Sequence, residues 1–399
     1  MVNFTILAGG FDIAGTLPFI ATYLFNSEAG SLDVVGQFPT GGNCSWISSG
    51  LTNRSVLYAV NEVSPTGALQ SFTVTSEGFL SPAVDTISSE GDRPAYTTAL
   101  SNFGRPQIAV MDYNSGNGRI VPLSKDGLHF DDSAASAGVI TFPVPAAPTS
   151  EGVSHPHMVL ELDEEILVPD LGGDTIWRLT QEATGNWTIV GSIPQPPSSG
   201  PRHLAVHNGF LYTLHETAST LTLQRLPAFP NGTSEIIANV STIPSNPLPG
   251  AIWAAAEILI PKSTSQFPIP YIYVSNRNTG VPDATGKGDS IAIFEHVHAG
   301  TSMAAEGSLK LVTQVFTGLQ QIRGMEIGLE GNRGNEFLIA AGVAGEGGTV
   351  VYKRVDGGRR LEEVARNLDI PTRSTFAKFS DDAGARFYDE LLRLNLKIF

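Results

Sequence analysis

The chain has 399 residues, of which 41% are hydrophobic, enough to bury a substantial core. Its 42 glycines and 26 prolines, against only 16% charged residues, favour an all-β protein with many turns over a helical one. The formal net charge of -15 argues against a surface for nucleic acid or an anionic membrane, and the single cysteine, Cys44, excludes an intramolecular disulfide and a cysteine-rich zinc site.

Seven apolar runs of strand type follow one another along the chain, with starts roughly 45 to 65 residues apart, within or above the periods of β-propeller blades. These runs are residues 4–11, 56–62, 107–113, 165–171, 210–216, 271–277 and 336–342. After a short polar turn, most are followed by a second run, at residues 69–74, 119–123, 175–179, 221–226, 290–294 and 349–352. The pattern predicts one β-hairpin in each of seven repeats.

Each hairpin has weaker strand patterns beside it. Residues 203–206 (His-Leu-Ala-Val) are an example of an inner strand before the first run, and turns such as residues 125–127 (Lys-Asp-Gly) precede an outer strand. Four antiparallel strands in each of seven repeats predict an all-β, seven-bladed β-propeller, forming a single domain over residues 1–399. A β-sandwich would not repeat a hairpin over the whole chain. We also expect one short amphipathic helix at residues 381–395.

Charged and polar residues recur where the predicted inner strands begin and where their partner strands end. Because a hairpin brings these two ends to the same edge, the residues are predicted to converge on one mouth of the central channel. They are His155, Arg202, His203, Glu216, Arg277, Arg323, Glu62 and Asn114. Arginine suits planar carboxylate or phosphate groups, and histidine and carboxylates suit proton transfer, so the set indicates an anion clamp with acid/base groups. The alternative is a scaffold in which the arginines pair with Asp170, Glu216 and Glu257.

A series of short motifs resembles that of a known family. The motifs are His-Pro-His-Met-Val at 155–159, Leu-Val-Pro-Asp-Leu-Gly at 167–172, Gly-Pro-Arg-His at 200–203, Ala-Ala-Glu-Ile at 255–258, Tyr-Val-Ser-Asn-Arg at 273–277 and Ile-Arg-Gly-Met at 322–325. Tyr-Ala-Val-Asn-Glu at 58–62 and Asp-Tyr-Asn-Ser-Gly at 112–116 extend it over nearly the whole chain. Each motif is weak alone, but the ordered series is similar to that of the seven-bladed β-propeller lactonase family. That family includes bacterial 6-phosphogluconolactonases and the fungal carboxy-cis,cis-muconate cyclase, and we expect a fungal member.

The resemblance implies a metal-free enzyme, without a cofactor, that acts on an anionic lactone or on its open acid. In a lactonase, Glu216 or His155 would be the general base, and Arg202 or Arg277 would stabilise the oxyanion. Arg323 would hold the anionic group of the substrate. The predicted catalytic residues are therefore His155, Glu216 and Arg202, and the predicted substrate-binding residues are Arg277, Arg323, His203, Glu257, Asn114 and Glu62. Residues 251–253 and the loop at 278–289 depart from the bacterial enzymes, so the substrate does not transfer with the resemblance.

Two other functions stay open on this sequence. In a muconate-type cycloisomerase the same groups would direct a carboxylate onto a double bond, while His155 or Glu216 delivers a proton to the adjacent carbon. A propeller that only binds a ligand is the third option, because fold does not imply function. The histidines match no metal-ligand spacing, so no metal site is expected. His296 and His298 are expected to be solvated surface residues.

The expected partner is a small-molecule lactone or carboxylate, with no nucleic acid and no membrane, and the expected state is a monomer or a weak oligomer. Six Asn-X-Ser/Thr triplets, beginning at Asn3, Asn43, Asn53, Asn186, Asn231 and Asn239, would accept glycans and favour an extracellular protein. A start at Met1 without a basic segment, and the lack of an apolar run long enough to span a bilayer, favour a cytoplasmic one. Both locations remain open.

Overall fold

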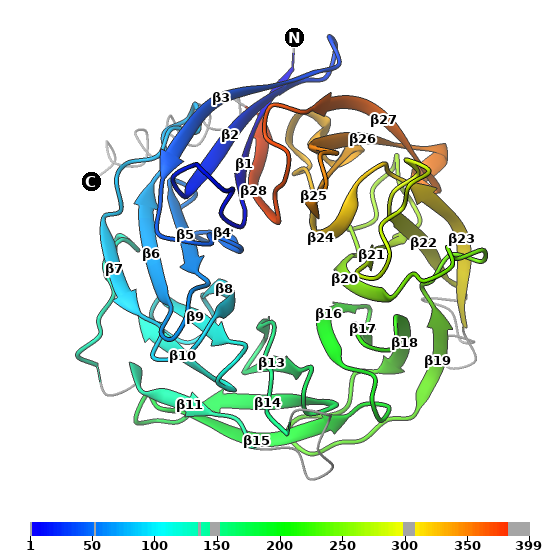
Figure 1. The fold of residues 1–399 in the computed structure, drawn as a ribbon. Coiled ribbons are helices and arrows are strands. Elements are labelled where there is room, and N and C mark those ends of the chain that lie inside the picture. Colours follow the sequence, from blue (N-terminus) through cyan, green and yellow to red (C-terminus); the bar gives the residue numbers. More distant parts are fainter. Residues whose placement is uncertain (1, 52, 135–136, 144–151, 298–307, 382–399) are drawn as a thin grey trace.

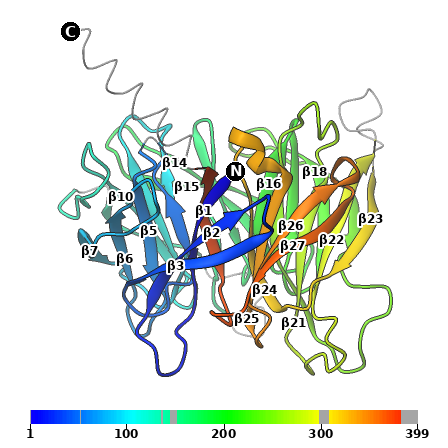
Figure 2. The same ribbon diagram turned by 90° about the horizontal axis from the view of Figure 1, so that it is seen from above.

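The computed structural model describes residues 2–51, 53–134, 137–143, 152–297 and 308–381. These ranges form seven four-stranded antiparallel sheets that stand around a central axis like the blades of a propeller (Figure 1). In the side view of Figure 2 the strands stand roughly upright, so the connecting loops gather on two opposite faces. The predicted seven-bladed β-propeller with four antiparallel strands per blade is confirmed.

The blades are numbered here in chain order, and their strands are given from the axis outward. Blade 1 has β28 (Thr375–Asp381), β1 (Asn3–Gly9), β2 (Phe19–Asn26) and β3 (Ser31–Pro39). Blade 2 has β4 (Ile47–Ser49), β5 (Val56–Asn61), β6 (Ala68–Thr73) and β7 (Asp85–Ser88). Blade 3 has β8 (Pro94–Leu100), β9 (Gln107–Asp112), β10 (Asn117–Pro122) and β11 (Val139–Thr141).

The remaining four blades follow the same order. Blade 4 has β12 (Leu160–Leu162), β13 (Glu165–Asp170), β14 (Thr175–Gln181) and β15 (Trp187–Pro194), and blade 5 has β16 (Pro201–His207), β17 (Phe210–His215), β18 (Thr220–Arg225) and β19 (Ile236–Ser241). Blade 6 has β20 (Trp253–Leu259), β21 (Ile272–Asn278), β22 (Ser290–Val297) and β23 (Ser308–Phe316). Blade 7 has β24 (Gln320–Ile327), β25 (Phe337–Ala344), β26 (Thr349–Val355) and β27 (Arg360–Asn367), with two short 3-10 helices, η3 (Gly331–Glu336) and η4 (Asp356–Gly358).

The predicted hairpins are the middle two strands of each blade. The seven first runs correspond to β1, β5, β9, β13, β17, β21 and β25, and the six second runs to β6, β10, β14, β18, β22 and β26. Every residue of β5, β9, β13 and β17 is buried, because a blade's middle strands are covered on both faces by the neighbouring blades. This is why these strands appear in the sequence as continuous apolar runs rather than alternating ones.

The two ends of the chain build blade 1 together. Strand β28 pairs antiparallel with β1, matching Leu7 with Ala377 and Ala8 with Phe376, and so supplies the inner strand of blade 1 (Figure 1). Asp381, the first residue of the expected helix at 381–395, is instead the last residue of β28, and the rest of that segment lies outside the described residues. Within the described ranges, no helix combines the length and apolarity needed to cross a membrane.

The core lies between the blades. Phe4 and Phe25 of blade 1 pack against Phe337 of blade 7, with ring centroids 5.6 and 4.9 Å from the Phe337 ring, and comparable clusters lie between other neighbouring blades. Because this packing fixes each blade against the next, loops at one end of the axis are held in a defined arrangement.

Inner strands of three successive blades contain β-bulges near their starts. In β16 the extra residue is Arg202, between the paired Pro201 and His203, and in β24 it is Arg323, between the paired Ile322 and Gly324. In β20 the bulge holds residues 256 and 257, which face only Ser275 on β21. A bulge bends the strand and re-aims a side chain, and such features are common beside active sites.

Candidate active site

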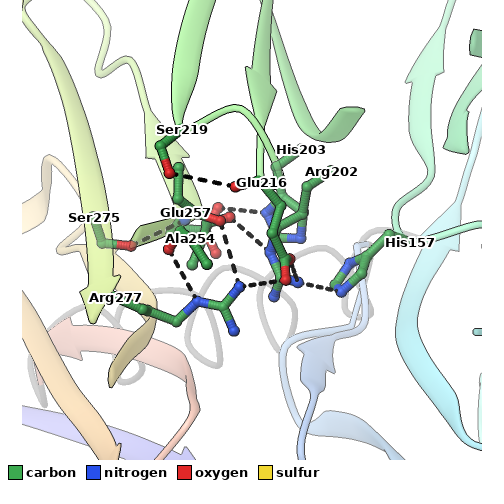
Figure 3. Close-up of polar contacts among 11 residues, drawn as sticks. His157, Arg202, His203, Glu216, Ser219, Ala254, Glu257, Ser275 and Arg277 are labelled. Carbon is green, nitrogen blue, oxygen red and sulfur yellow. Dashed lines mark hydrogen bonds and ion pairs between the residues drawn. The ribbon is translucent and has the colours of Figure 1, made fainter. Parts of the chain in front are cut away.

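The Gly-Pro-Arg-His segment brings Arg202 and Glu216 together. Gly200 has a φ of 64°, and a Cβ there would lie 2.3 Å from the Thr217 Oγ1, so a side chain at this position would be strained and would clash. The close approach lets the Glu216 amide donate a hydrogen bond of 2.7 Å to the Gly200 carbonyl. Arg202, the bulge residue, is only 1% exposed and points toward Glu216 at the end of β17 (Figure 3).

Glu216 is shared by two arginines from neighbouring blades. One carboxylate oxygen accepts from Arg202 Nη1 at 2.6 Å and the other pairs with Arg277 Nη2 at 2.7 Å (Figure 3). Burial alone would raise the pKa of Glu216, but Arg277, Arg202 and Arg323 outweigh it and hold the pKa at about 2. Glu216 is therefore a permanent anion that fixes two guanidinium groups relative to each other.

Backbone carbonyls of β20 hold the same two arginines from the other side. Arg202 Nε donates to the Ala256 carbonyl at 3.0 Å, and Arg277 Nε donates to the Ala254 carbonyl at 3.3 Å. Two guanidinium nitrogens remain, Nη2 of Arg202 and Nη1 of Arg277, and neither makes a hydrogen bond with the described part of the chain. Burial lowers the pKa of Arg202 to about 9 despite its contact with Glu216, so Arg202 keeps its charge at neutral pH.

His157 is part of this cluster and was not among the predicted site residues. Its Nε2 lies 2.5 Å from Arg202 Nη1, which can only donate, so the ring is neutral and carries its proton on Nδ1. Burial and the charge of Arg202 hold the pKa of His157 well below its usual value. The signal was present in the His-Pro-His spacing, since residues two apart in an extended segment point the same way.

His155 also contacts Tyr113, whose ring meets both histidines. Its Nδ1 lies 2.6 Å from the Tyr113 carbonyl oxygen and must donate to it, so in the neutral ring Nε2 carries the lone pair. The Tyr113 ring stacks on His155, with centroids 4.4 Å apart, and meets His157 edge-on at 5.7 Å. The His155 amide also donates to Asp170 at 2.7 Å, which fixes the backbone of this segment.

Arg323 lies over the ring of Phe11, at 5.2 Å from its centroid, and forms no ion pair with the described residues. Burial lowers the pKa of Arg323, while the nearby charge of Glu62 opposes this effect. Burial raises the pKa of Glu62, and Arg323 in turn opposes that shift. Arg323 and Glu62 are thus close enough to affect each other's pKa, but no carboxylate of the described residues forms an ion pair with Arg323.

A second pair, His203 and Glu257, lies beside the arginines. His203 Nδ1 is 2.8 Å from a Glu257 carboxylate oxygen, and both side chains are less than a tenth exposed (Figure 3). The Trp46 ring meets the His203 ring edge-on, with centroids 5.3 Å apart. Burial lowers the pKa of His203, with Glu257 opposing the shift.

Among the described residues, ion pairs join Arg202 and Arg277 to Glu216, and a hydrogen bond joins His203 to Glu257, whereas Asn114 lies apart from these contacts. Asn114 is exposed and donates to Asp92 at 3.3 Å, and no hydrogen bond or ion pair of the described residues links it to the arginines. The expectation that His296 is a solvated surface residue is wrong, because it is 8% exposed and its Nδ1 lies 2.7 Å from the Tyr212 hydroxyl, between blades 5 and 6. His298 lies outside the described residues. In the described ranges no group of three or more His, Cys, Asp or Glu side chains is arranged to hold a metal ion.

The structure is a seven-bladed propeller in which arginines of two neighbouring blades share one carboxylate. Residues 6–377 match the family described as lactonase, 7-bladed beta-propeller, and the chain belongs to that family. It is 24% identical over 325 residues to a protein of the fungus Arthroderma benhamiae named as a probable 6-phosphogluconolactonase, covering 77% of this chain and 74% of that one.

Solved structures share the fold at low sequence identity. A protein from Lactobacillus plantarum has a TM-score of 0.75 at 18% identity, over 94% of this chain and 98% of that one. The periplasmic gluconolactonase of Pseudomonas aeruginosa has a TM-score of 0.73 at 18% identity, over 94% of this chain and 98% of that one. The expected resemblance to the lactonase propellers is thus confirmed.

Proposed function

We propose that this protein hydrolyses an anionic lactone at the mouth formed by the inner ends of blades 4 to 7. The observation that carries the proposal is the shared Glu216 carboxylate, which fixes Arg202 and Arg277 so that each keeps one guanidinium nitrogen without a hydrogen-bond partner among the described residues. Two fixed N–H groups of this kind are what an oxyanion requires, because they cost no reorganisation when the charge develops. Membership of the lactonase family supports the same reaction class.

His155 is the better candidate for the general base. Glu216, with a pKa of about 2, is a weak base near neutral pH, and His157 already accepts a hydrogen bond at its only lone-pair nitrogen. The Tyr113 carbonyl holds the neutral His155 ring in the tautomer that carries its proton on Nδ1. We therefore assign the proton transfers to His155 and the positioning of the two arginines to Glu216.

The reaction then runs in two steps. His155 Nε2 removes a proton from water as the oxygen attacks the lactone carbonyl carbon, and the carbonyl oxygen becomes an oxyanion between Arg202 and Arg277. The tetrahedral intermediate collapses, the ring C–O bond breaks, and the departing alkoxide takes the proton from His155. The product is the open hydroxy acid, which leaves as a carboxylate.

Charge at the mouth indicates an anionic substrate. Three arginines meet there, and among the described residues Glu216 alone is ion-paired with them, in a chain whose overall net charge is -15. A local excess of positive charge in an acidic protein attracts and orients an anion. Arg323, without a bound carboxylate among the described residues, is the proposed anchor for a phosphate or carboxylate group elsewhere on the substrate.

The proposal is tested by a pH-stat screen of phosphorylated, carboxylated and neutral lactones, with ultraviolet monitoring of muconates in parallel. Replacing His155 with Gln should lower kcat by about a hundred- to ten-thousandfold, because general-base catalysis typically supplies that much. The matched control is His129→Gln, since the His129 side chain is 59% exposed and lies apart from the arginines. Full activity of H155Q on a lactone would contradict the assignment of the base.

The panel also separates the alternatives. Turnover of a muconate with none of any lactone would replace the hydrolase with a cycloisomerase. No turnover of any compound, with wild type and variants folded, would favour a propeller that binds a ligand without catalysis.

A further inference from the structure

The two arginines depend on a backbone feature that lies outside the reacting groups. Both guanidinium groups donate through Nε to carbonyls at the start of β20, Arg202 to Ala256 and Arg277 to Ala254. A third, longer contact of 3.5 Å joins Arg277 Nη2 to the Ala255 carbonyl. Three consecutive carbonyls therefore face the arginines, although a regular strand points successive carbonyls in alternate directions.

The bulge in β20 explains this arrangement. Ala255 pairs with Asn276 and Ile258 with Val274, so residues 256 and 257 together face the single residue Ser275. In a regular ladder, alternate carbonyls of β20 would pair with β21, and the carbonyls between them would point away from β21. The extra residue interrupts the ladder, and this frees carbonyls for the arginines while turning Glu257 toward His203.

Ser275 supplies the hydrogen bond that the bulge would otherwise lose. The Glu257 amide donates to the Ser275 Oγ at 3.0 Å, and Ser275 is fully buried (Figure 3). A buried amide without a partner is costly, so this contact decides whether the bulge is stable in its observed form. The Ile258 amide donates to the Glu257 carboxylate at 3.1 Å, which closes the other half of the bulge.

We propose that Ser275 is a positioning residue, and that the β20 bulge it closes aligns Arg202 and Arg277 for a single oxyanion. The inference rests on the proposed function for its kinetic consequence, but the alignment itself is a property of the folded chain. Ser275 touches neither arginine and acts through the carbonyls of Ala254 and Ala256.

The kinetic test compares Ser275→Ala with a matched buried serine elsewhere. Ser71, in β6 of blade 2, is also fully buried and donates to the Leu128 carbonyl at 2.6 Å, so Ser71→Ala removes a similar hydrogen bond away from the mouth. S275A should lower kcat by about a hundredfold, because small misplacements of catalytic groups have effects of that size. The KM of S275A should stay close to that of wild type, because the Arg323 bulge is unchanged. S71A should keep the wild-type kcat. Ser275→Thr keeps the hydroxyl group and should therefore have the activity that S275A lacks.

A second measurement is independent of turnover. In protein labelled with 15N-arginine, the Nε–H groups of Arg202 and Arg277 should exchange slowly with solvent in wild type and S71A, and faster in S275A. If S275A does not fold, Ser275→Cys takes its place, because a thiol of similar volume is a poor acceptor.

The outcomes are distinct. Unchanged Nε–H exchange in S275A overturns the inference, whatever happens to kcat, and so does a kcat loss no larger than that of S71A. If wild type hydrolyses no lactone, the proposed function fails, and the exchange measurement alone decides whether Ser275 holds the arginines.

Discussion

The three arginines of the proposed site differ in how the protein holds their side chains. Arg202 and Arg277 are each bound by Glu216 and by a backbone carbonyl, whereas Arg323 rests on the Phe11 ring and has no carboxylate bound to it among the described residues. A group that binds substrate equally in the ground and transition states affects KM, while groups that receive developing charge affect kcat. The two kinds of arginine should therefore be separable by kinetics.

We predict that Arg323→Gln raises KM for anionic lactones with little change in kcat. Losing a charge-assisted hydrogen bond to the substrate should raise KM about ten- to a hundredfold. Steady-state kinetics on an anionic lactone and a neutral analogue check this, since the neutral compound should be unaffected. Arg54→Gln, at an exposed loop position, is the control and should leave both constants unchanged. A drop in kcat with unchanged KM would instead place Arg323 at the oxyanion.

At the scale of single residues, the sequence could name candidate site residues but could not predict which of them contact one another. The hairpin argument predicted that His155, Arg202, Glu216, Arg277 and Arg323 converge on one mouth, because it needs only the ends of strands. It did not identify His157 as the neighbour of Arg202, nor show that Glu216 bridges two arginines, because those facts depend on side-chain directions within bulged strands. A bulge adds one residue to a strand and so shifts the alternation of its side chains between the two faces of the sheet. A period-two pattern read from the sequence therefore assigns the side chains at a bulge to the wrong face.

At the scale of single strands, the middle strands carry buried polar side chains at the ends that face the mouth. Asp112, the last residue of β9, is fully buried; one carboxylate oxygen accepts from Asn117 Nδ2 at 3.2 Å, and the other has no partner among the described residues. Burial raises the pKa of Asp112 to about 7, against its usual 3.8. The folded chain therefore binds a proton here that the unfolded chain has already lost at neutral pH.

We predict that Asp112→Asn makes the protein less sensitive to rising pH. Because the folded pKa is the higher one, the contribution of Asp112 to stability is fully present below pH 3.8 and is lost as the pH rises through about 7. The loss amounts to at most about 4 kcal/mol for a shift of this size. Unfolding midpoints in urea at pH 5 and pH 8 should differ less in D112N than in wild type. Asp33→Asn, at an exposed position of β3, is the control, and equal pH dependence in wild type and D112N would refute the assignment.

The strands that could be predicted from the sequence are those in which every successive residue is buried. The middle strands of the blades appear as apolar runs because both faces are covered, whereas outer strands such as β19 mix exposed and half-buried residues and give a weaker pattern. The inner strands are shortened or interrupted by bulges, and β12 has only three residues, so their bounds were not predictable from composition.

At the scale of the whole molecule, the number of blades followed from the number of hairpins, but the closure of the ring did not. Nothing local in residues 375–381 marks them as the partner of the first apolar run, which begins near residue 4. The pairing of β28 with β1 joins residues more than 360 positions apart, and it became visible only in the structure. Ring closure removes the free edge that an open set of blades would expose.

We predict that the closing strand decides whether the ring is stable. A chain ending at Arg373 lacks β28 and should lose cooperative unfolding or melt far below wild type, because it uncovers the β1 edge and removes Phe376 and Ala377, both buried, from the packing around blade 1. A chain ending at Asp381 keeps every described strand and is the matched control. Circular dichroism melts and limited proteolysis of the three proteins measure the difference. A peptide of residues 375–381 should partly restore the shorter chain by adding a strand to the open edge. Equal melting of all three proteins would show that blade 1 is stable without its closing strand, and that the arrangement at the mouth does not depend on it.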